Sequence, residues 1–271
     1  MTNPAELSEA FQKSFGGRPG IYRAPGRVNL IGEHTDYKEG LVMPAAIDLS
    51  TLVAISARKD RKIVVRSENF GETIELNLDH PPERGRGHWS DYPFGVAVKL
   101  KQLGQCLCGA NILVRGEVPI GSGLGSSAAI EVATGYALLD VCGSNIDRLA
   151  LAKLCQQAES EFVGMRCGLM DQFTSCFGQT GHALMLDCRV LDHKLLALPA
   201  YVKLVVCNTM VLSYEVNLAP SGAKSTWPPI VSKTILRSAG ARGSGNHRAI
   251  NINISPLRGK ANKSTSVALR S

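Results

Sequence analysis

The segment GEVPIGSGLGSSAAI, residues 116–130, constrains the fold of this chain more than any other stretch. A strand-like run over 111–115 precedes it, and a long apolar stretch with helical spacing over 126–141 follows it. Glycines let backbone N–H groups approach an anion closely, and the start of a helix carries partial positive charge. The succession of strand, glycine loop and helix therefore predicts a phosphate cradle, with a plain tight turn as the alternative.

Two well-known phosphate-binding motifs do not fit this loop. The Walker pattern is absent because no Gly-Lys-Ser/Thr closes the loop. The dinucleotide pattern fails because Ser126 occupies the place of its third glycine. The paired serines at the helix start, Ser126 and Ser127, favour a phosphate cradle of another kind over the plain turn.

A second unusual segment is APGRVNLIGEHTDY, residues 24–37, in which polar and charged residues crowd between Gly32 and Tyr37. Such residues cannot all be buried without partners, because an unpaired buried polar group is costly. A ligand with many hydroxyl groups explains the segment. A solvated loop is the alternative.

The periodicity of apolar residues predicts the fold class. Leu7, Phe11 and Phe15 repeat at helical spacing behind Pro4, which predicts a docking helix at the N-terminus. Strands are predicted at 51–55, 63–65, 73–78, 111–115, 183–187 and 201–208, and helices at 91–103, 126–141, 147–163 and 170–177. Strands come first and helices cluster later, so we expect an α+β domain and not a doubly wound parallel sheet.

The basic excess of the chain is confined to its last sixty residues. The chain has 30 Lys and Arg against 23 Asp and Glu, but residues 212–271 hold nine of the basic residues and one acidic residue, Glu215. Residues 1–211 thus hold 21 basic and 22 acidic residues, and no nucleic-acid partner is expected for them. The segment 212–271 sustains no apolar period and predicts a disordered tail, with a nucleic-acid-binding basic arm as the alternative. The strand at 201–208 would then be an exposed apolar edge.

Neither secretion nor membrane insertion is indicated by the sequence. The N-terminus lacks a basic start followed by an apolar run, and no stretch approaches eighteen uninterrupted apolar residues. A cytoplasmic location and no membrane partner are expected. The eight cysteines form no C-x-x-C pair and no zinc-like cluster, so they are expected to be reduced thiols in the core.

Three motifs in order resemble the galactokinases of the GHMP kinase family. They are GRVNLIGEHTDY at 26–37, PIGSGLGSSAA at 119–129, and Gln157-Ala-Glu159 together with CGLMDQF at 167–173. The resemblance covers roughly residues 10–211. It implies an N-terminal docking helix and lead-in at 1–20, a GHMP kinase N-terminal domain with a mixed sheet packed against helices at 21–180, the start of a largely missing second domain at 181–211, and the atypical tail at 212–271.

The resemblance also implies a role for each residue that matches a motif. Arg27 and Asp171 are the implied catalytic pair, with Asp171 against the anomeric hydroxyl of the sugar. The implied sugar-binding residues are Glu33, His34, Thr35, Asp36, Gly168 and Asp171; the implied ATP-binding residues are Ser67, Gly121, Ser122, Gly123, Leu124, Gly125, Ser126 and Ser127; the implied Mg²⁺ ligands are Ser127 and Glu159. Without the resemblance, Glu159 reads as an exposed helical charge, Arg27 as a surface cation and Asp171 as a helix N-terminal acid.

The implied reaction is transfer of the ATP γ-phosphate to the anomeric hydroxyl of galactose, with N-acetylgalactosamine as the alternative substrate. Asp171 acts either as a general base or through positioning and charge. A third glycine-rich motif expected near the C-terminus has no match, its nearest candidate being residues 240–245. Activity is therefore expected to be impaired, and a non-catalytic sugar-binding and ATP-binding regulator or a non-functional truncated product are the alternatives. A monomer is expected if the chain folds.

Overall fold

A computed structural model of the chain describes residues 3–199, 201–202, 204–207, 235–237 and 249–251. Its helices are α1 (Pro4–Phe15), the 3-10 helix η1 (Asp36–Lys38), α2 (Asp91–Gln102), α3 (Ser126–Val141), α4 (Arg148–Gln157), the π-helix η2 (Ala158–Val163) and α5 (Met170–Phe177). Its strands are β1 (Gly20–Asn29), β2 (Leu41–Val42), β3 (Pro44–Arg58), β4 (Lys62–Ser67), β5 (Thr73–Asn77), β6 (Gly109–Gly116), β7 (His182–Asp187), β8 (Asp192–Ala197), β9 (Val205–Cys207), β10 (Ile235–Arg237) and β11 (Ala249–Asn251).

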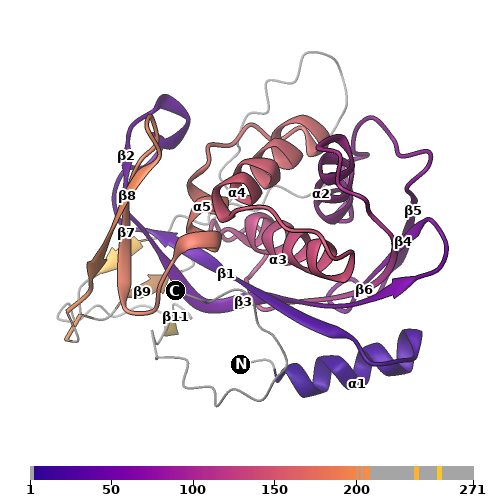
Figure 1. Cartoon of the computed structure of the whole chain (residues 1–271). Coiled ribbons are helices and arrows are strands. Elements are labelled where there is room, and N and C mark those ends of the chain that lie inside the picture. Colours follow the sequence, from indigo (N-terminus) through magenta and orange to yellow (C-terminus); the bar gives the residue numbers. More distant parts are fainter. Residues whose placement is uncertain (1–2, 200, 203, 208–234, 238–248, 252–271) are drawn as a thin grey trace.

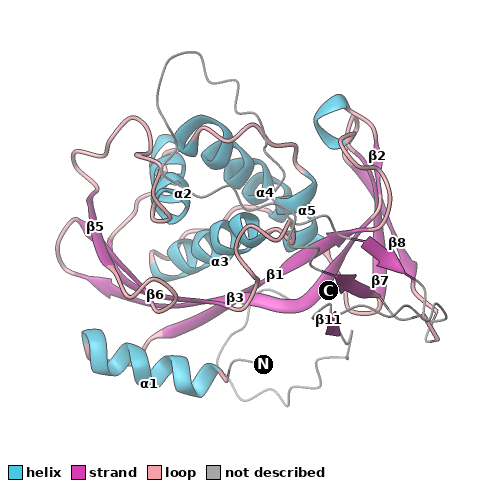
Figure 2. Ribbon diagram, turned by 180° about the vertical axis from the view of Figure 1, so that it is seen from behind, coloured by secondary structure: helices cyan, strands magenta, loops and turns pink. Residues whose placement is uncertain are grey.

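Eight strands form one mixed sheet in the order β2-β7-β3-β6-β4-β5, with β1 also paired to β3 and β8 to β7. All of the pairs are antiparallel except β4 with β6, which run parallel. Helices α2 to α5 lie on one side of the sheet, and α1 lies on the other (Figures 1 and 2). The predicted α+β class is therefore confirmed.

The long strand β3 carries apolar side chains on both faces, which explains the layers. Leu52 and Ala54 pack with Leu7 and Phe11 of α1 in one buried cluster. Their neighbour Val53 belongs to the main core on the opposite face. Because successive side chains of a strand point to opposite faces, one apolar run serves both layers.

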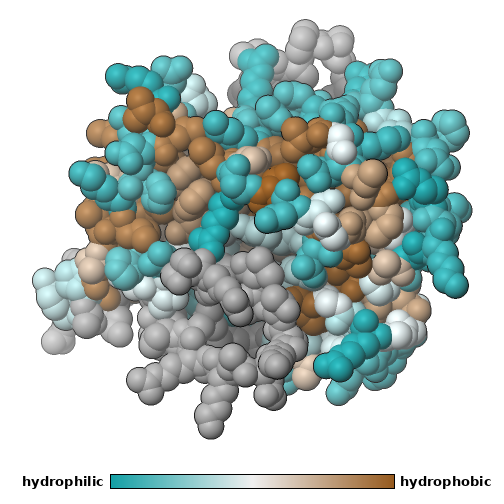
Figure 3. All heavy atoms as spheres, in the orientation of Figure 1, coloured by the Kyte–Doolittle hydropathy of each residue, from teal (hydrophilic) through white to brown (hydrophobic). Residues whose placement is uncertain are grey.

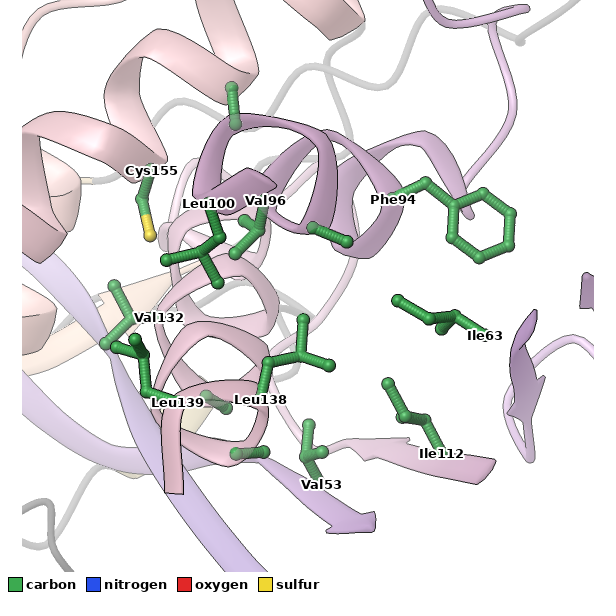
Figure 4. Close-up of a cluster of buried hydrophobic side chains, with 14 of the residues drawn as sticks. Val53, Ile63, Phe94, Val96, Leu100, Ile112, Val132, Leu138, Leu139 and Cys155 are labelled. Atoms are coloured by element: carbon green, nitrogen blue, oxygen red, sulfur yellow. The ribbon is translucent and has the colours of Figure 1, made fainter. Parts of the chain in front are cut away.

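Helix α3 lies in the middle of the main core and is apolar around most of its circumference. Its Val132, Leu138 and Leu139 lie between α2 and the sheet, as Figure 4 shows. At Gly135 an added Cβ would come within 2.6 Å of a methyl carbon of Leu151 in α4, so the two helices approach closely. A helix fixed on all sides holds its N-terminus, where the glycine loop ends, in one position.

The boundary expected between 180 and 181 falls inside this sheet. Strand β7 pairs with β3, and β8 pairs with β7, through backbone hydrogen bonds. Both strands lie in the stretch 181–211 that the resemblance assigned to a second domain. They therefore extend the first sheet and do not begin a separate one. Strands β1, β2 and β8 were not predicted at all.

The C-terminal strands also correct one expectation. Strand β9, at the end of the predicted 201–208 strand, pairs antiparallel with β10 on one side and β11 on the other. Val206 of β9 is buried. The prediction that this strand is an exposed apolar edge was therefore wrong, because it did not anticipate pairing by residues of the tail. The remaining tail residues, for which disorder was predicted, lie outside the described residues.

The seven cysteines whose side chains are described are free thiols, but they are not all core residues. Cys155 and Cys176 are buried, whereas Cys106 is exposed in the connection between α2 and β6. The Sγ atoms of Cys108 and Cys142 lie 3.1 Å apart. The expectation of core thiols was wrong for Cys106, because residue type alone does not distinguish a core position from a turn.

On the face that Figure 3 shows, apolar residues cover the region of β2, β7 and β8 and also appear nearer the centre and lower right of the view. Leu41, Val190 and Leu196 are among the exposed apolar residues. No helix within the described part of the chain is long and apolar enough to cross a membrane.

Candidate active site

The glycine loop has the backbone of an anion-binding site. Gly121, Gly123 and Gly125 have φ angles of 67°, 68° and 71°, in the left-handed region that glycine adopts without a steric cost. Helix α3 begins directly after Gly125, which has no side chain with which to cap the helix. The first N–H groups of α3 therefore remain available to an anion at the positive end of the helix.

Strand β1 is joined to the glycine loop by backbone contacts. It has an irregularity in register between Pro25 and Arg27, and the backbone N–H of Arg27 donates to the carbonyl of Leu124 at 2.8 Å. A Cβ at Gly26 would lie 2.7 Å from the same carbonyl oxygen, which explains why glycine occupies this position. The Arg27 guanidinium also donates to the carbonyl of Gly123.

Arg27 and Asp171 form a bidentate ion pair next to this loop. Nε and Nη2 of Arg27 donate to Oδ1 and Oδ2 of Asp171 at 2.7 and 2.5 Å. The side chains are 12% and 22% exposed, so the pair borders solvent. Asp171 lies in the first turn of α5, and Ser175 of this helix donates to the carbonyl of Pro25 at 2.9 Å. The guanidinium therefore fixes the plane of the carboxylate on two anchored elements.

Asp36 and Gly168 complete a polar cluster around this ion pair. Burial raises the pKa of Asp36, a hydrogen bond from the backbone of Tyr37 opposes that rise, and the charge of Asp171 adds to it. A Cβ at Gly168 would collide with the Asp36 carboxylate, so the backbone of Gly168 lies directly against it. Two carboxylates and one guanidinium thus converge on a small region beside the glycine loop.

The neighbouring residues of the 33–35 segment are placed differently. Glu33 and His34 are exposed, and His34 has a φ of 60° in the left-handed region. The Thr35 hydroxyl lies 2.8 Å from the carbonyl of Gly32 and 3.0 Å from that of Leu41, so it ties the loop together. The sugar-binding roles of these three residues stay predictions.

Ser67 lies at the end of β4 and is buried. Its Oγ accepts the backbone N–H of Phe70 at 3.3 Å, within a turn. This turn reaches the glycine-rich segment through Asn69, whose side chain exchanges two hydrogen bonds with the backbone of Gly116. The contact lies before the glycine loop itself, and the nucleotide-binding role of Ser67 stays a prediction.

Glu159 is a buried carboxylate beside the start of α3. It is 7% exposed and lies in the π-helix that continues α4, a distortion frequent at functional sites. Ser127 hydrogen-bonds it. Burial, followed by the charge of Asp171, raises the pKa of Glu159 to about 7, while hydrogen bonds from Ser127, Cys167 and Gln172 oppose the rise. The alternative of an exposed helical charge is therefore wrong.

Two buried polar residues at this site were not predicted. Glu131 of α3 and Gln172 of α5 are both 0% exposed. Nε2 of Gln172 donates to Oε2 of Glu131 at 3.0 Å and to Oε2 of Glu159 at 2.5 Å. Burial raises the pKa of Glu131 well above its usual value. The available signal was a lone acidic residue within the apolar run AAIEVAT.

Replacing Glu131 with Gln is expected to flatten the pH dependence of stability. The pKa of Glu131 is higher in the folded than in the unfolded chain, so its contribution to stability is full below about 4.5 and falls as the pH rises toward the folded pKa. Glu131→Gln removes that loss, and its free energy of unfolding should exceed that of the wild type more at pH 8 than at pH 5. Urea unfolding at both pH values measures this, with Glu9→Gln on the exposed face of α1 as the control. Equal pH slopes for the wild type and Glu131→Gln would contradict it.

A phosphate cradle that opens onto an Arg–Asp ion pair and a buried carboxylate–hydroxyl pair has the parts of a small-molecule kinase. Comparison of the sequence with known protein families agrees with this class of enzyme. The galactokinase galactose-binding signature matches residues 9–57, and the GHMP kinases N terminal domain matches residues 91–179. Over these residues the chain is similar to GHMP kinases and, within residues 9–57, to galactokinases.

Individual relatives give the extent of the similarity. Over 212 residues the chain is 44% identical to the galactokinase of Roseiflexus sp. (strain RS-1) and 46% identical to that of Chloroflexus aggregans. Each match covers 78% of this chain and 54% of the relative, so the chain spans about half the length of the curated relatives it matches.

Solved structures agree with these relatives. The galactokinase of Lactococcus lactis complexed with galactose superposes with a TM-score of 0.74 at 36% identity, over 79% of this chain and 57% of that one. The mevalonate kinase of Methanococcus jannaschii superposes with a TM-score of 0.59 at 21% identity, over 73% of this chain and 64% of that one. The second likeness concerns the fold alone.

Proposed function

We propose that this chain binds ATP and galactose and carries the reacting groups for transfer of the γ-phosphate to the anomeric hydroxyl of the sugar. One observation carries the proposal: the glycine loop lies against the Arg27–Asp171 pair. A Cβ at Gly125 would lie 3.2 Å from Cγ of Arg27 and 3.6 Å from Oδ2 of Asp171. A phosphate on the loop is thereby next to a carboxylate that can receive a sugar hydroxyl.

The polar cluster supplies the sugar side of the proposed site. The carboxylates of Asp36 and Asp171 accept hydrogen bonds, as hydroxyl groups require. The exposed Glu33 and His34 on the adjoining segment add an acceptor and an imidazole at its rim. A solved relative, the galactokinase of Lactococcus lactis, was obtained in complex with galactose, which supports galactose as the acceptor here.

The residues of the ion pair have distinct tasks in the proposed reaction. Asp171 accepts the hydrogen bond of the anomeric hydroxyl and orients its oxygen toward the γ-phosphate. Arg27 holds the carboxylate and lies beside the loop, where negative charge spreads over the phosphoryl oxygens during transfer. The general-base role and the electrostatic role both require this carboxylate in this orientation.

Ser127 and Glu159 fit the magnesium ion that ATP-dependent kinases use. Both offer oxygen atoms, the ligands that Mg²⁺ prefers. Ser127 lies at the start of α3 and hydrogen-bonds Glu159 of the π-helix. Glu159 is 7% exposed, so its carboxylate is largely removed from water beside the proposed metal position. The bound ion would neutralise charge on the phosphates of ATP.

Release of ADP in a coupled assay with ATP and galactose tests the proposed activity. Galactose-dependent turnover supports it, and replacing galactose with N-acetylgalactosamine tests the alternative acceptor. Titration of galactose and of nucleotide should accompany the assay, because the chain spans about half the length of its relatives. Binding of both ligands without turnover would favour the non-catalytic regulator, and binding of neither would contradict the proposed site.

Replacing Gly125 with Ala is expected to weaken ATP binding at least about tenfold, or about 1.4 kcal/mol. Position 125 has a left-handed backbone conformation, which strains any residue with a Cβ, and the added Cβ would lie 3.2 Å from Cγ of Arg27. Gly143→Ala is the matched control, because Gly143 has a φ of 65° and open space around its Cβ. Both variants carry similar backbone strain, but only Gly125→Ala should lose nucleotide affinity. Equal affinities in a nucleotide titration would indicate that the loop is only a turn.

A further inference from the structure

Three polar side chains from three helices meet in the protein interior, and one of them is the proposed metal ligand Glu159. They are Glu131 of α3, Glu159 of the π-helix and Gln172 of α5. The Gln172 amide is shared: it donates to Oε2 of Glu131 at 3.0 Å and to Oε2 of Glu159 at 2.5 Å. One residue thus uses both of its N–H groups to join two acidic side chains.

This arrangement is a poor way to stabilise a core. Glu131 and Gln172 are 0% exposed, and Oε1 of each has no hydrogen-bond partner within the described residues. Buried polar atoms without partners destabilise a fold, and apolar side chains of similar size would pack here without that cost. Residues that break a packing rule in this way are expected at functional sites.

The hydrogen bonds also restrict the orientation of Glu159. Gln172 Nε2 and Cys167 Sγ both approach the same oxygen, Oε2, at 2.5 and 3.5 Å. The carboxylate cannot turn without losing these contacts. Gln172 is itself fixed, because the other N–H of its amide is bound to Glu131 on a different helix.

We propose that Gln172 is a positioning residue that, anchored on Glu131, orients the Glu159 carboxylate to bind Mg²⁺ together with Ser127. The inference rests on the proposed function, because it concerns the magnesium ion of the nucleotide complex. Partners that orient a metal ligand typically change metal affinity about 10- to 100-fold when they are removed. Gln172 directly follows Asp171 in the first turns of α5, so one short helix orients both the sugar-side carboxylate and the metal-side carboxylate.

Glu131 anchors the Gln172 amide in this arrangement. Its Oε2 accepts the N–H of Gln172 at 3.0 Å. A glutamine at this position also offers such an oxygen, whereas a leucine offers none.

The test compares ADP affinity with and without Mg²⁺ by calorimetry in a set of variants. In Gln172→Leu and Gln172→Asn, the factor by which Mg²⁺ raises ADP affinity should fall about 10- to 100-fold. ADP affinity without Mg²⁺ should stay unchanged. Asparagine keeps the amide but is too short to join both acids, and it serves if Gln172→Leu does not fold. Glu131→Leu should lose the enhancement and Glu131→Gln should keep it.

Thr174→Val is the matched control, because it removes a different buried polar group from the same helix, a hydroxyl that donates to the carbonyl of Met170 at 2.6 Å. It should keep the response to Mg²⁺. A folded Gln172→Leu or Gln172→Asn with the wild-type response would overturn the positioning role while leaving the proposed function intact. A wild-type chain whose ADP affinity does not respond to Mg²⁺ would overturn the metal site, and this inference with it.

Discussion

Replacing Asp171 with Asn is expected to lower galactose-dependent ADP release about 10²- to 10⁴-fold and to leave nucleotide affinity nearly unchanged. Asn offers one acceptor where Asp171 offers two, and its NH₂ group would face the Arg27 guanidinium, which only donates. The bidentate pair is then lost, and with it the orientation of the carboxylate that is proposed to receive the anomeric hydroxyl. The glycine loop that is proposed to bind the phosphates is formed by other residues and stays intact.

Two companion variants make this result specific. Asp147→Asn is the matched control, because Asp147 caps α4 by accepting the N–H of Ala150 at 2.8 Å and asparagine caps a helix equally well. Its turnover should equal that of the wild type. Arg27→Lys should lose most turnover, because an ammonium group cannot replace a planar fork that joins two carboxylate oxygens. Wild-type turnover in Asp171→Asn would remove the catalytic assignment.

The features predicted well from the sequence are those with local signals. The glycine loop and α3 are adjacent in the chain, and left-handed φ angles at Gly121, Gly123 and Gly125 are what glycines in such a loop allow. Helix α1 was predicted from Pro4 and the spacing of its apolar residues, and in the structure Asn3 caps it by accepting the N–H of Ala5. Each of these depends on residues within one turn or one helix.

The strands that were missed lack such signals. Strand β1 alternates buried and partly exposed residues, but Pro25 and Gly26 are poor strand formers and hide this alternation in the sequence. Strand β8 is a sheet edge with mostly exposed or partly exposed residues, including Leu196. Membership of β7 in the first sheet depends on pairing with β3, far away in the sequence, and no local pattern reports it.

The residues of the site also divide into those with a local sequence signal and those without one. The Arg27–Asp171 contact joins residues 144 positions apart, and only the resemblance to a known family suggested it. The burial of Glu159 was hidden because Glu159, Ser160 and Glu161 read as a solvated helix face, whereas the π-helix turns Glu159 inward and leaves Glu161 exposed. Roles that depend on a bound ligand, such as those of Glu33 and His34, stay predictions.

Replacing Gly168 with Ala is expected to weaken galactose binding strongly, because no side chain fits between its backbone and Asp36. An added Cβ would collide with the Asp36 carboxylate and lie only 2.9 Å from Cβ of Asp36. Asp36 must then move away from Asp171, or the 164–169 connection must shift. Overpacking of this kind costs about 1–3 kcal/mol, which corresponds to about 5- to 150-fold in galactose affinity if the sugar needs the original arrangement.

The matched control for Gly168→Ala is Gly116→Ala at the end of β6. An added Cβ at Gly116 would lie 3.6 Å from Oδ1 of Asn69 and 3.8 Å from Oγ1 of Thr51, which are ordinary contacts. Galactose titration should therefore separate the two alanine variants, and ADP titration should not, because the collision at Gly168 lies on the sugar side of the ion pair. Unchanged galactose affinity in Gly168→Ala would mean that Asp36 does not bind the sugar in the position it occupies here, and the sugar-binding role would then fall to the exposed residues of the same segment.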